Sequence, residues 1–123
     1  MDSFQFGQDY GRAVSAYGSS GARVVHLLRS IPVSVVTIYL EPHGVLGMHP
    51  AAAGQLFLVV AGSGWAAAGA ASCQLSPGTT VFWRQGEAHE TRAGEEGLVA
   101  VVVEGESLIE ALNTDFRGTR DET

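Results

Sequence analysis

Three side chains in this 123-residue sequence are suited to hold a divalent metal ion together: His49, Gln55 and His89. Neutral imidazoles bind Zn, Cu, Fe and Ni, and a Gln amide adds a carbonyl oxygen. Such a set leaves coordination positions for water, so we expect a divalent transition metal (Zn, Ni, Mn or Fe) with an open side. Because the Gln oxygen carries no charge to offset a dication, we expect weak metal binding.

The same three residues also fit a second arrangement, a hydrogen-bonded polar cluster that contains no metal. Buried polar groups need partners, and a Gln between two His supplies both a donor and an acceptor. Metal analysis of the protein distinguishes the two arrangements, and the sequence leaves both open.

Short strands must bring these residues together, because the two histidines are far apart in the chain. The sequence has 16 Gly, which separate runs rich in Val, Ile, Thr, Phe and Trp that are shorter than a typical helix. This pattern is typical of an all-β sandwich or barrel. The expected strands are Val33–Glu41, Gln55–Ala61, Trp65–Ser72, Thr79–Arg84, Ala88–Ala93 and Leu98–Glu104.

The loop lengths predict which residues face one another. If 50–54 is a hairpin loop, His49 lies opposite Gln55, and a loop at 85–87 likewise places Trp83 opposite His89. Period-two alternation then directs one face of each hairpin toward a common interior. We therefore predict an apolar pocket for a small-molecule ligand beside the metal ligands, although side chains that fill the interior are the alternative. The predicted pocket residues are Gly47, Phe57, Val59, Val81, Trp83 and Thr91.

The segment from residue 44 to 62, GVLGMHPAAAGQLFLVVAG, resembles the first motif of the cupin superfamily. That motif contains two His, a Glu and a closing Gly. Gly47 falls at the position of the first His, His49 at the second, Gln55 at the Glu, and Gly62 at the closing Gly. Gly47 cannot coordinate a metal through a side chain, so the resemblance implies an altered ligand set.

The segment from residue 78 to 89, GTTVFWRQGEAH, resembles the second cupin motif, with Arg84 in place of its Pro and His89 at its His. The two motifs agree in order and separation, and the resemblance covers about residues 33–104. It implies a small antiparallel β-barrel with a jelly-roll-like arrangement. Cupins commonly hold Fe, Mn, Ni, Zn or Cu on three His and one Glu, and many are enzymes.

The chain is expected to form one domain with short flanking segments. Residues 1–20 are expected to be an irregular or edge-pairing N-terminal arm, and residues 21–113 the barrel. Leu108 and Leu112 have helical spacing, which predicts a short C-terminal helix over 106–113. The last residues, 114–123, are expected to form a polar tail.

Acidic residues outnumber basic ones by 13 to 7, which gives a net charge of −6. A nucleic-acid-binding protein normally has a basic face, so no nucleic-acid partner is expected. The N-terminal residues have no basic region followed by an apolar stretch, so we do not expect them to be a signal peptide. No apolar run approaches the ~20 residues of a membrane span, and we therefore expect a cytoplasmic protein with no membrane partner. Cys73 is the only cysteine, which excludes an intramolecular disulfide.

Two classes of function are compatible with these residues. The first is a metal-dependent cupin enzyme, an oxygenase or an isomerase, that acts on a small organic molecule. The second is a non-catalytic, metal-free module that binds a small molecule or forms a dimer. A homodimer is expected in either class, because cupins are often dimers and the N-terminal arm can pair with a neighbouring edge strand.

Overall fold

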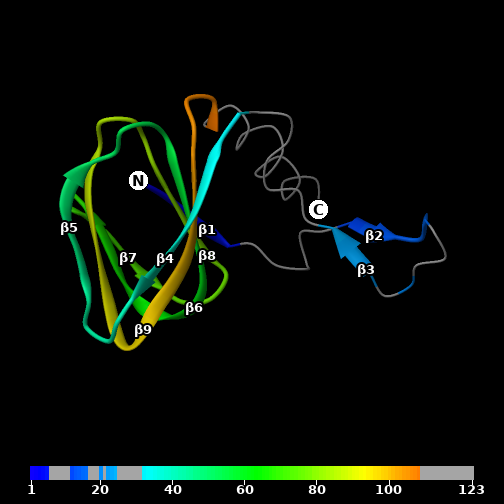
Figure 1. Ribbon diagram of the computed structural model, residues 1–123, viewed down its shortest axis with the longest axis horizontal. Coiled ribbons are helices and arrows are strands. Elements are labelled where there is room, and N and C mark those ends of the chain that lie inside the picture. The colour runs from blue at the N-terminus through cyan, green and yellow to red at the C-terminus, as the bar shows by residue number, and fades with distance from the viewer. Residues whose placement is uncertain (6–11, 17–19, 21, 25–31, 109–123) are drawn as a thin grey trace.

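Two long antiparallel strands, β6 (Gln55–Ala68) and β9 (Ala88–Glu104), form the frame of the fold (Figure 1). The first half of β6 pairs with the second half of β9, beginning with Gln55 opposite Glu104. Register shifts interrupt the pairing on both sides of Gly62, and irregularities of this kind bend a strand. Beyond the bend, the second half of β6 pairs with the first half of β9.

The computed structural model describes residues 1–5, 12–16, 20, 22–24 and 32–108. The expected C-terminal helix lies outside the described residues from position 109 onward, as does the whole expected polar tail. The remaining strands are shorter than β6 and β9: β1 (Asp2–Gln5), β2 (Arg12–Val14), β3 (Ala22–Val24), β4 (Ser34–Leu40), β5 (Val45–Pro50), β7 (Ala71–Leu75) and β8 (Thr79–Trp83).

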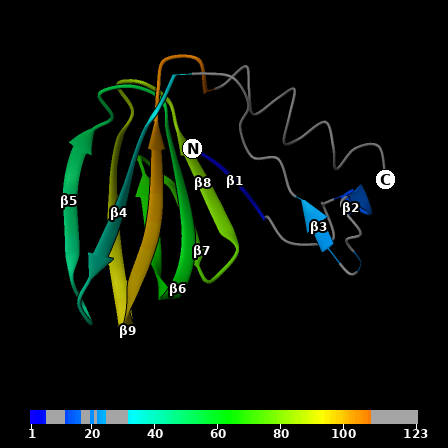
Figure 2. The same cartoon turned by 45° about the vertical axis from the view of Figure 1, so that its right-hand side comes forward.

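A single seven-stranded antiparallel sheet contains every described strand except β2 and β3. Its main path runs β1-β8-β6-β9-β4, while β7 pairs with the second half of β6 and β5 pairs with the first half of β9. Figures 1 and 2 show the sheet curving, with β5 and β8 on opposite sides. In the described part of the chain the sheet does not close, so the predicted barrel is an open, curved sheet.

The main hydrophobic core lies inside this curved sheet and draws on both halves of the long strands. Its largest members include Phe57, Val59, Leu75, Val81 and Trp83, all at most 2% exposed. Neighbouring residues point to the other face, because strand side chains alternate. They form a second cluster that contains Leu56, Leu58, Phe82, Val103 and Leu108. The first half of β6 is therefore buried on both faces, which fixes the backbone where it reaches Gln55.

Both predicted hairpin pairings are wrong. His49 lies opposite His89 rather than Gln55. Gln55 in turn lies opposite Trp83 on one side and opposite Glu104 on the other. The strands that were expected to be adjacent therefore belong to different parts of the curved sheet.

The loops at 51–54 and 84–87 explain this difference, because each crosses from one side of the sheet to the other. The loops also bond to each other: the Ala51 N–H donates to the Glu87 carbonyl at 3.1 Å, and the Gly86 N–H donates to the Ala51 carbonyl at 2.8 Å. Loop length alone cannot distinguish such a crossing from a hairpin, since both need only a few residues.

Several glycines that were expected to end strands lie inside continuous ones. Gly62, with φ of 85°, sits at the bend of β6. At Gly64 an added Cβ would collide with the Arg92 carbonyl oxygen of the paired strand. The predicted strand Trp65–Ser72 is instead a hairpin between β6 and β7, with its turn at Gly69. These glycines permit bending and close approach of the backbones, which the sequence pattern alone does not separate from a turn.

The N-terminal strand β1 pairs with β8 of its own chain along an edge of the main sheet. An ion pair between Asp2 and Arg84, at 3.0 Å, joins the same two segments. Residues 12–14 and 22–24 form a separate two-stranded sheet. Among the residues described, no helix has the length and hydrophobicity needed to cross a membrane.

Candidate functional site

A cavity of about 140 Å³ lies at one end of the main core, inside the curved sheet. All three predicted metal ligands line it, together with three of the predicted pocket residues. Among the described residues, the lining consists of Ile38, Leu46, His49, Gln55, Phe57, Trp83, His89, Thr91 and Val102. The structure therefore gathers residues from β4, β5, β6, β8 and β9 around one small space.

The two histidines meet as a cross-strand pair on β5 and β9. Their ring centroids are 4.5 Å apart, and the rings are tilted by 54°. His89 is buried at 3% exposure, whereas His49 is exposed. Both imidazoles thus line the cavity, and that of His49 is also reachable from solvent.

Backbone carbonyls determine the tautomer of both rings. His49 Nδ1 lies 2.7 Å from the Gly47 carbonyl oxygen, and His89 Nδ1 lies 3.0 Å from the Glu87 carbonyl oxygen. A carbonyl oxygen only accepts hydrogen bonds, so each Nδ1 carries the proton in the neutral ring. Each Nε2 then keeps a free lone pair, which is the form of imidazole that binds a metal.

The His89 ring is held by an aromatic stack. It lies on Trp83 with ring centroids 4.0 Å apart and an interplanar angle of 19°, while Phe57 meets the Trp83 ring edge-on at 5.4 Å. Burial lowers the pKa of His89 below its ordinary value, and the nearby His49 lowers it further. The hydrogen bond to the Glu87 carbonyl and the Glu87 charge act in the opposite direction without cancelling the effect. His89 is therefore neutral at pH 7.

The lowered pKa of His89 predicts that folding stability decreases in mild acid. Below its ordinary pKa of 6.5, His89 takes up a proton in the unfolded chain before it does so in the folded one. The free energy of unfolding should therefore fall as the pH drops below about 6.5, and His89→Gln should remove this part of the dependence. Urea unfolding between pH 5 and 8 measures the effect.

His43→Asn is the matched control for that measurement. His43 is exposed on the turn before β5 and has φ of 62°, a conformation that Asn tolerates better than most residues. This variant retains His89, so it should still lose stability below about pH 6.5. An unchanged slope in His89→Gln would contradict the assignment.

Gln55 is held by a carboxylate that the sequence analysis did not single out. Its Nε2 donates to Glu104 Oε1 at 3.1 Å, across the directly opposed pair of β6 and β9. Because a carboxylate oxygen accepts and does not donate, the amide nitrogen must be the atom that faces Glu104. The amide oxygen is then directed away from Glu104.

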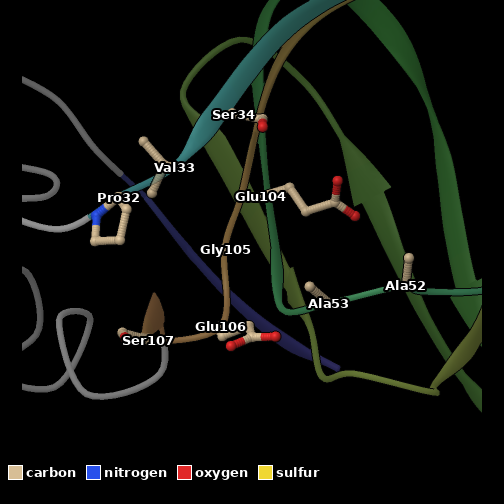
Figure 3. Close-up of a pocket in the computed structure, with 9 residues that line it drawn as sticks. All are labelled: Pro32, Val33, Ser34, Ala52, Ala53, Glu104, Gly105, Glu106 and Ser107. Atoms are coloured by element: carbon tan, nitrogen blue, oxygen red, sulfur yellow. The ribbon is translucent and has the colours of Figure 1, made fainter.

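Glu104 also lines a larger open groove, of about 510 Å³, at the same end of the sheet (Figure 3). In Figure 3 its carboxylate extends from β9 toward the loop that carries Ala52 and Ala53. Glu106 lines the same groove. Glu104 thus lies between the groove on one side and Gln55 on the other.

Three predicted pocket residues do not line the cavity. Val59 and Val81, both 0% exposed, lie in the main core away from the cavity lining. Gly47 is exposed at the register shift of β5. Its contribution to the site is its backbone carbonyl, which accepts the hydrogen bond from His49 Nδ1. A register shift moves a residue off the face that simple alternation assigns to it.

Ile38, Leu46 and Val102 line the cavity but were missed, as was Glu104 behind it. Val102 lies in the apolar run of residues 98–103, which has no polar residue to mark the inward face. Ile38 lies between Thr37 and Tyr39, and this alternation was the signal that could have placed it on the inner face. A glutamate at the end of an apolar strand is commonly solvent-exposed, so Glu104 carried no distinguishing signal. Only the pairing of β6 with β9 places it beside Gln55.

The donors present fit a small divalent ion. Two imidazole Nε2 lone pairs and one amide oxygen suit Zn, Ni or Fe, while water or a ligand would complete the coordination. In the described parts of the chain, no cluster of three or more His, Cys, Asp or Glu side chains is placed to hold a metal. A third protein ligand at this cavity would therefore have to be the neutral Gln55. A carboxylate in its place would bind a metal more strongly.

No protein-family model matches the chain, and no curated protein sequence matches it significantly. Its structure nevertheless matches 85 chains of solved structures. A cupin superfamily protein from Desulfitobacterium hafniense superposes with a TM-score of 0.56 at 12% identity, over 63% of this chain and 71% of that chain. An RmlC-like cupin from Shewanella frigidimarina gives a TM-score of 0.54 at 17% identity, over 58% and 65% of the two chains. The chain has a cupin fold.

The cupin fold agrees with the two motifs found in the sequence. Segment 44–62 forms β5 and the first half of β6, and segment 78–89 forms β8 and the start of β9. A further match is a predicted oxalate decarboxylase from Thermotoga maritima, with a TM-score of 0.52 at 20% identity, over 56% of this chain and 62% of that chain. At these identities the similarity establishes the cupin fold alone.

Proposed function

We propose that this cupin-fold chain binds a divalent transition metal through His49, His89 and Gln55, and a small organic ligand beside it. The observation that carries the proposal is the histidine pair, with ring centroids 4.5 Å apart and both Nδ1 atoms on backbone carbonyls. Contacts of this kind orient the histidines of metal sites and leave Nε2 available. The neutral Gln oxygen makes the proposed metal binding weak.

The cavity limits the size and the chemistry of the proposed ligand. Its volume of about 140 Å³ is close to the roughly 150 Å³ cavity that holds benzene in another protein, so the ligand is about as large as benzene. Phe57 and Val102 supply apolar contacts, while Thr91 supplies a hydroxyl group. When bound, the metal would act as a Lewis acid toward a ligand oxygen.

The reaction class that we propose is an oxygenase or isomerase reaction on a small organic molecule. The described lining residues include no lysine or arginine, so ligand charge would be balanced by the metal rather than by a side chain. His49 is exposed and next to the second histidine, so it is the histidine of the cavity that solvent reaches. A solved structure with the same fold is described as a predicted oxalate decarboxylase, which favours small organic acids as the first substrates to test.

The deciding experiment is a metal titration of untagged protein. We expect one ion per chain for at least one of Zn(II), Ni(II), Mn(II) and Fe(II), measured by calorimetry and by elemental analysis of the isolated protein. If no ion binds at stoichiometric level after refolding with each metal, the metal proposal is wrong.

A specific observation favours a second candidate function, ligand binding without metal. The indole nitrogen of Trp83 is buried and has no hydrogen-bond partner among the described residues, although Trp83 lines the cavity. A ligand that moves the Trp83 ring enough to expose this nitrogen, and that carries an acceptor oxygen, would satisfy the donor. In chelator-treated protein, titration with small carboxylic acids should then change the Trp fluorescence, and an unchanged signal would count against this candidate.

A further inference from the structure

We infer that Glu104 is a positioning residue of the metal site, and that it supplies through Gln55 the negative charge that the metal ligands themselves lack. The inference rests on the proposed function, because it takes Gln55 as a ligand. It goes beyond that function by assigning a role to a residue outside the cavity lining.

The backbone frame leaves Gln55 little freedom. Gln55 lies between Trp83 on β8 and Glu104 on β9, with both neighbours in register. Leu56, the next residue, is 1% exposed in the outer apolar cluster, so the strand cannot rotate without exposing it. The side chain of Gln55 therefore stays on the inner face, beside the cavity.

The contact with Glu104 then decides which end of the amide faces the cavity. A free Gln amide can turn over and present either its NH₂ group or its oxygen, and an NH₂ group would repel a cation. Glu104 Oε1 accepts from the amide nitrogen at 3.1 Å, which leaves the oxygen on the side away from Glu104. Glu104 thereby selects the orientation of Gln55 that can bind a metal.

The same hydrogen bond changes the charge distribution of the amide. A hydrogen bond to a carboxylate is stronger than one between neutral groups, and it draws the amide proton toward Glu104. Polarisation along a hydrogen-bonded chain strengthens the next interaction, so the Gln55 oxygen becomes a better donor to a metal. With Glu104 bonded to its amide nitrogen, Gln55 should bind a metal more strongly than a neutral Gln ligand does and less strongly than a Glu ligand does.

Glu106 provides a matched control for this inference. It carries the same charge and lines the same groove as Glu104 (Figure 3). It is exposed, and in the described part of the chain no hydrogen bond joins it to Gln55. A purely long-range attraction of a cation would involve both residues, whereas positioning of the amide involves only Glu104.

The first test compares metal affinities by calorimetry with the metal that the wild type binds best. Glu104→Ala should weaken binding by about 10- to 100-fold, the range for residues that orient metal ligands, while Glu106→Ala should change it by less than about 3-fold. Glu104→Gln keeps an acceptor oxygen but no charge, so its affinity should lie between the two. Equal losses in Glu104→Ala and Glu106→Ala would overturn the inference.

The second test reads the amide itself, in metal-free protein. The side-chain NH₂ signals of Gln55, assigned by their loss in Gln55→Glu, should show slow hydrogen exchange in the wild type and in Glu106→Ala but fast exchange in Glu104→Ala. Unchanged signals in Glu104→Ala would overturn the inference whether or not a metal binds. If these signals change as expected but the wild type binds no metal, the proposed metal binding is wrong. The conclusion that Glu104 orients the Gln55 amide is then still correct.

Discussion

Replacing His49 with Ala is expected to lower the affinity for the bound metal by at least about 100-fold. The loss of a residue that only orients a ligand costs about 10- to 100-fold, so removal of a ligand should cost more. The remaining His89 and Gln55 are both neutral and offer only two donors. Because His49 is exposed, the variant should keep the wild-type stability, which makes it the clean test of the site. Calorimetric titration measures the affinity, and urea unfolding measures the stability.

His89→Ala should lower the affinity to a similar extent, but it also removes a buried ring from its stack on Trp83. A loss of stability is therefore expected in this variant and not in His49→Ala. His43→Asn again serves as the control, because His43 is exposed and is not part of the cavity lining. Wild-type affinity in both cavity variants would show that these imidazoles do not hold the metal.

Replacing Trp83 with Ala is expected to lower the free energy of unfolding by about 3–5 kcal/mol, the usual cost of truncating a large buried aromatic residue. Trp83 is 1% exposed and contacts Phe57 and His89. The cavity left behind would join the existing one of about 140 Å³ and would remove the support of the His89 ring. Urea unfolding measures the change in stability.

Trp83→Phe separates packing from the indole nitrogen. Phe keeps part of the aromatic contact and removes an N–H that is buried without a partner in the described structure. Because an unsatisfied buried donor is itself destabilising, its removal offsets part of the lost packing. We expect Trp83→Phe to cost less than half as much stability as Trp83→Ala. Equal losses in the two variants would contradict this account of Trp83.

The predicted metal ligands do line one cavity, but the strand pairing that was expected to bring them together is not the one in the structure. His49 and Gln55 were expected to face each other across one hairpin, but they are on strands that do not pair. They line the same cavity because the bends in β6 and β9 place β5 opposite the first half of β6. The alternation of side chains directed Gln55, Phe57 and Trp83 inward correctly, since alternation does not depend on which strand is the neighbour.

The amino-acid sequence was sufficient to indicate an all-β chain, the two motif segments and the residue types of the site, because alternation and residue spacing are local properties. Tertiary structure alone decided that His49 pairs with His89, that the sheet of the described strands stays open, and that Glu104 hydrogen-bonds to Gln55. These features depend on contacts between strands that are distant along the chain, and short loops connect hairpins and crossings equally well. A carboxylate 49 positions from its partner leaves no local pattern, and its role appears only once the two long strands are in register.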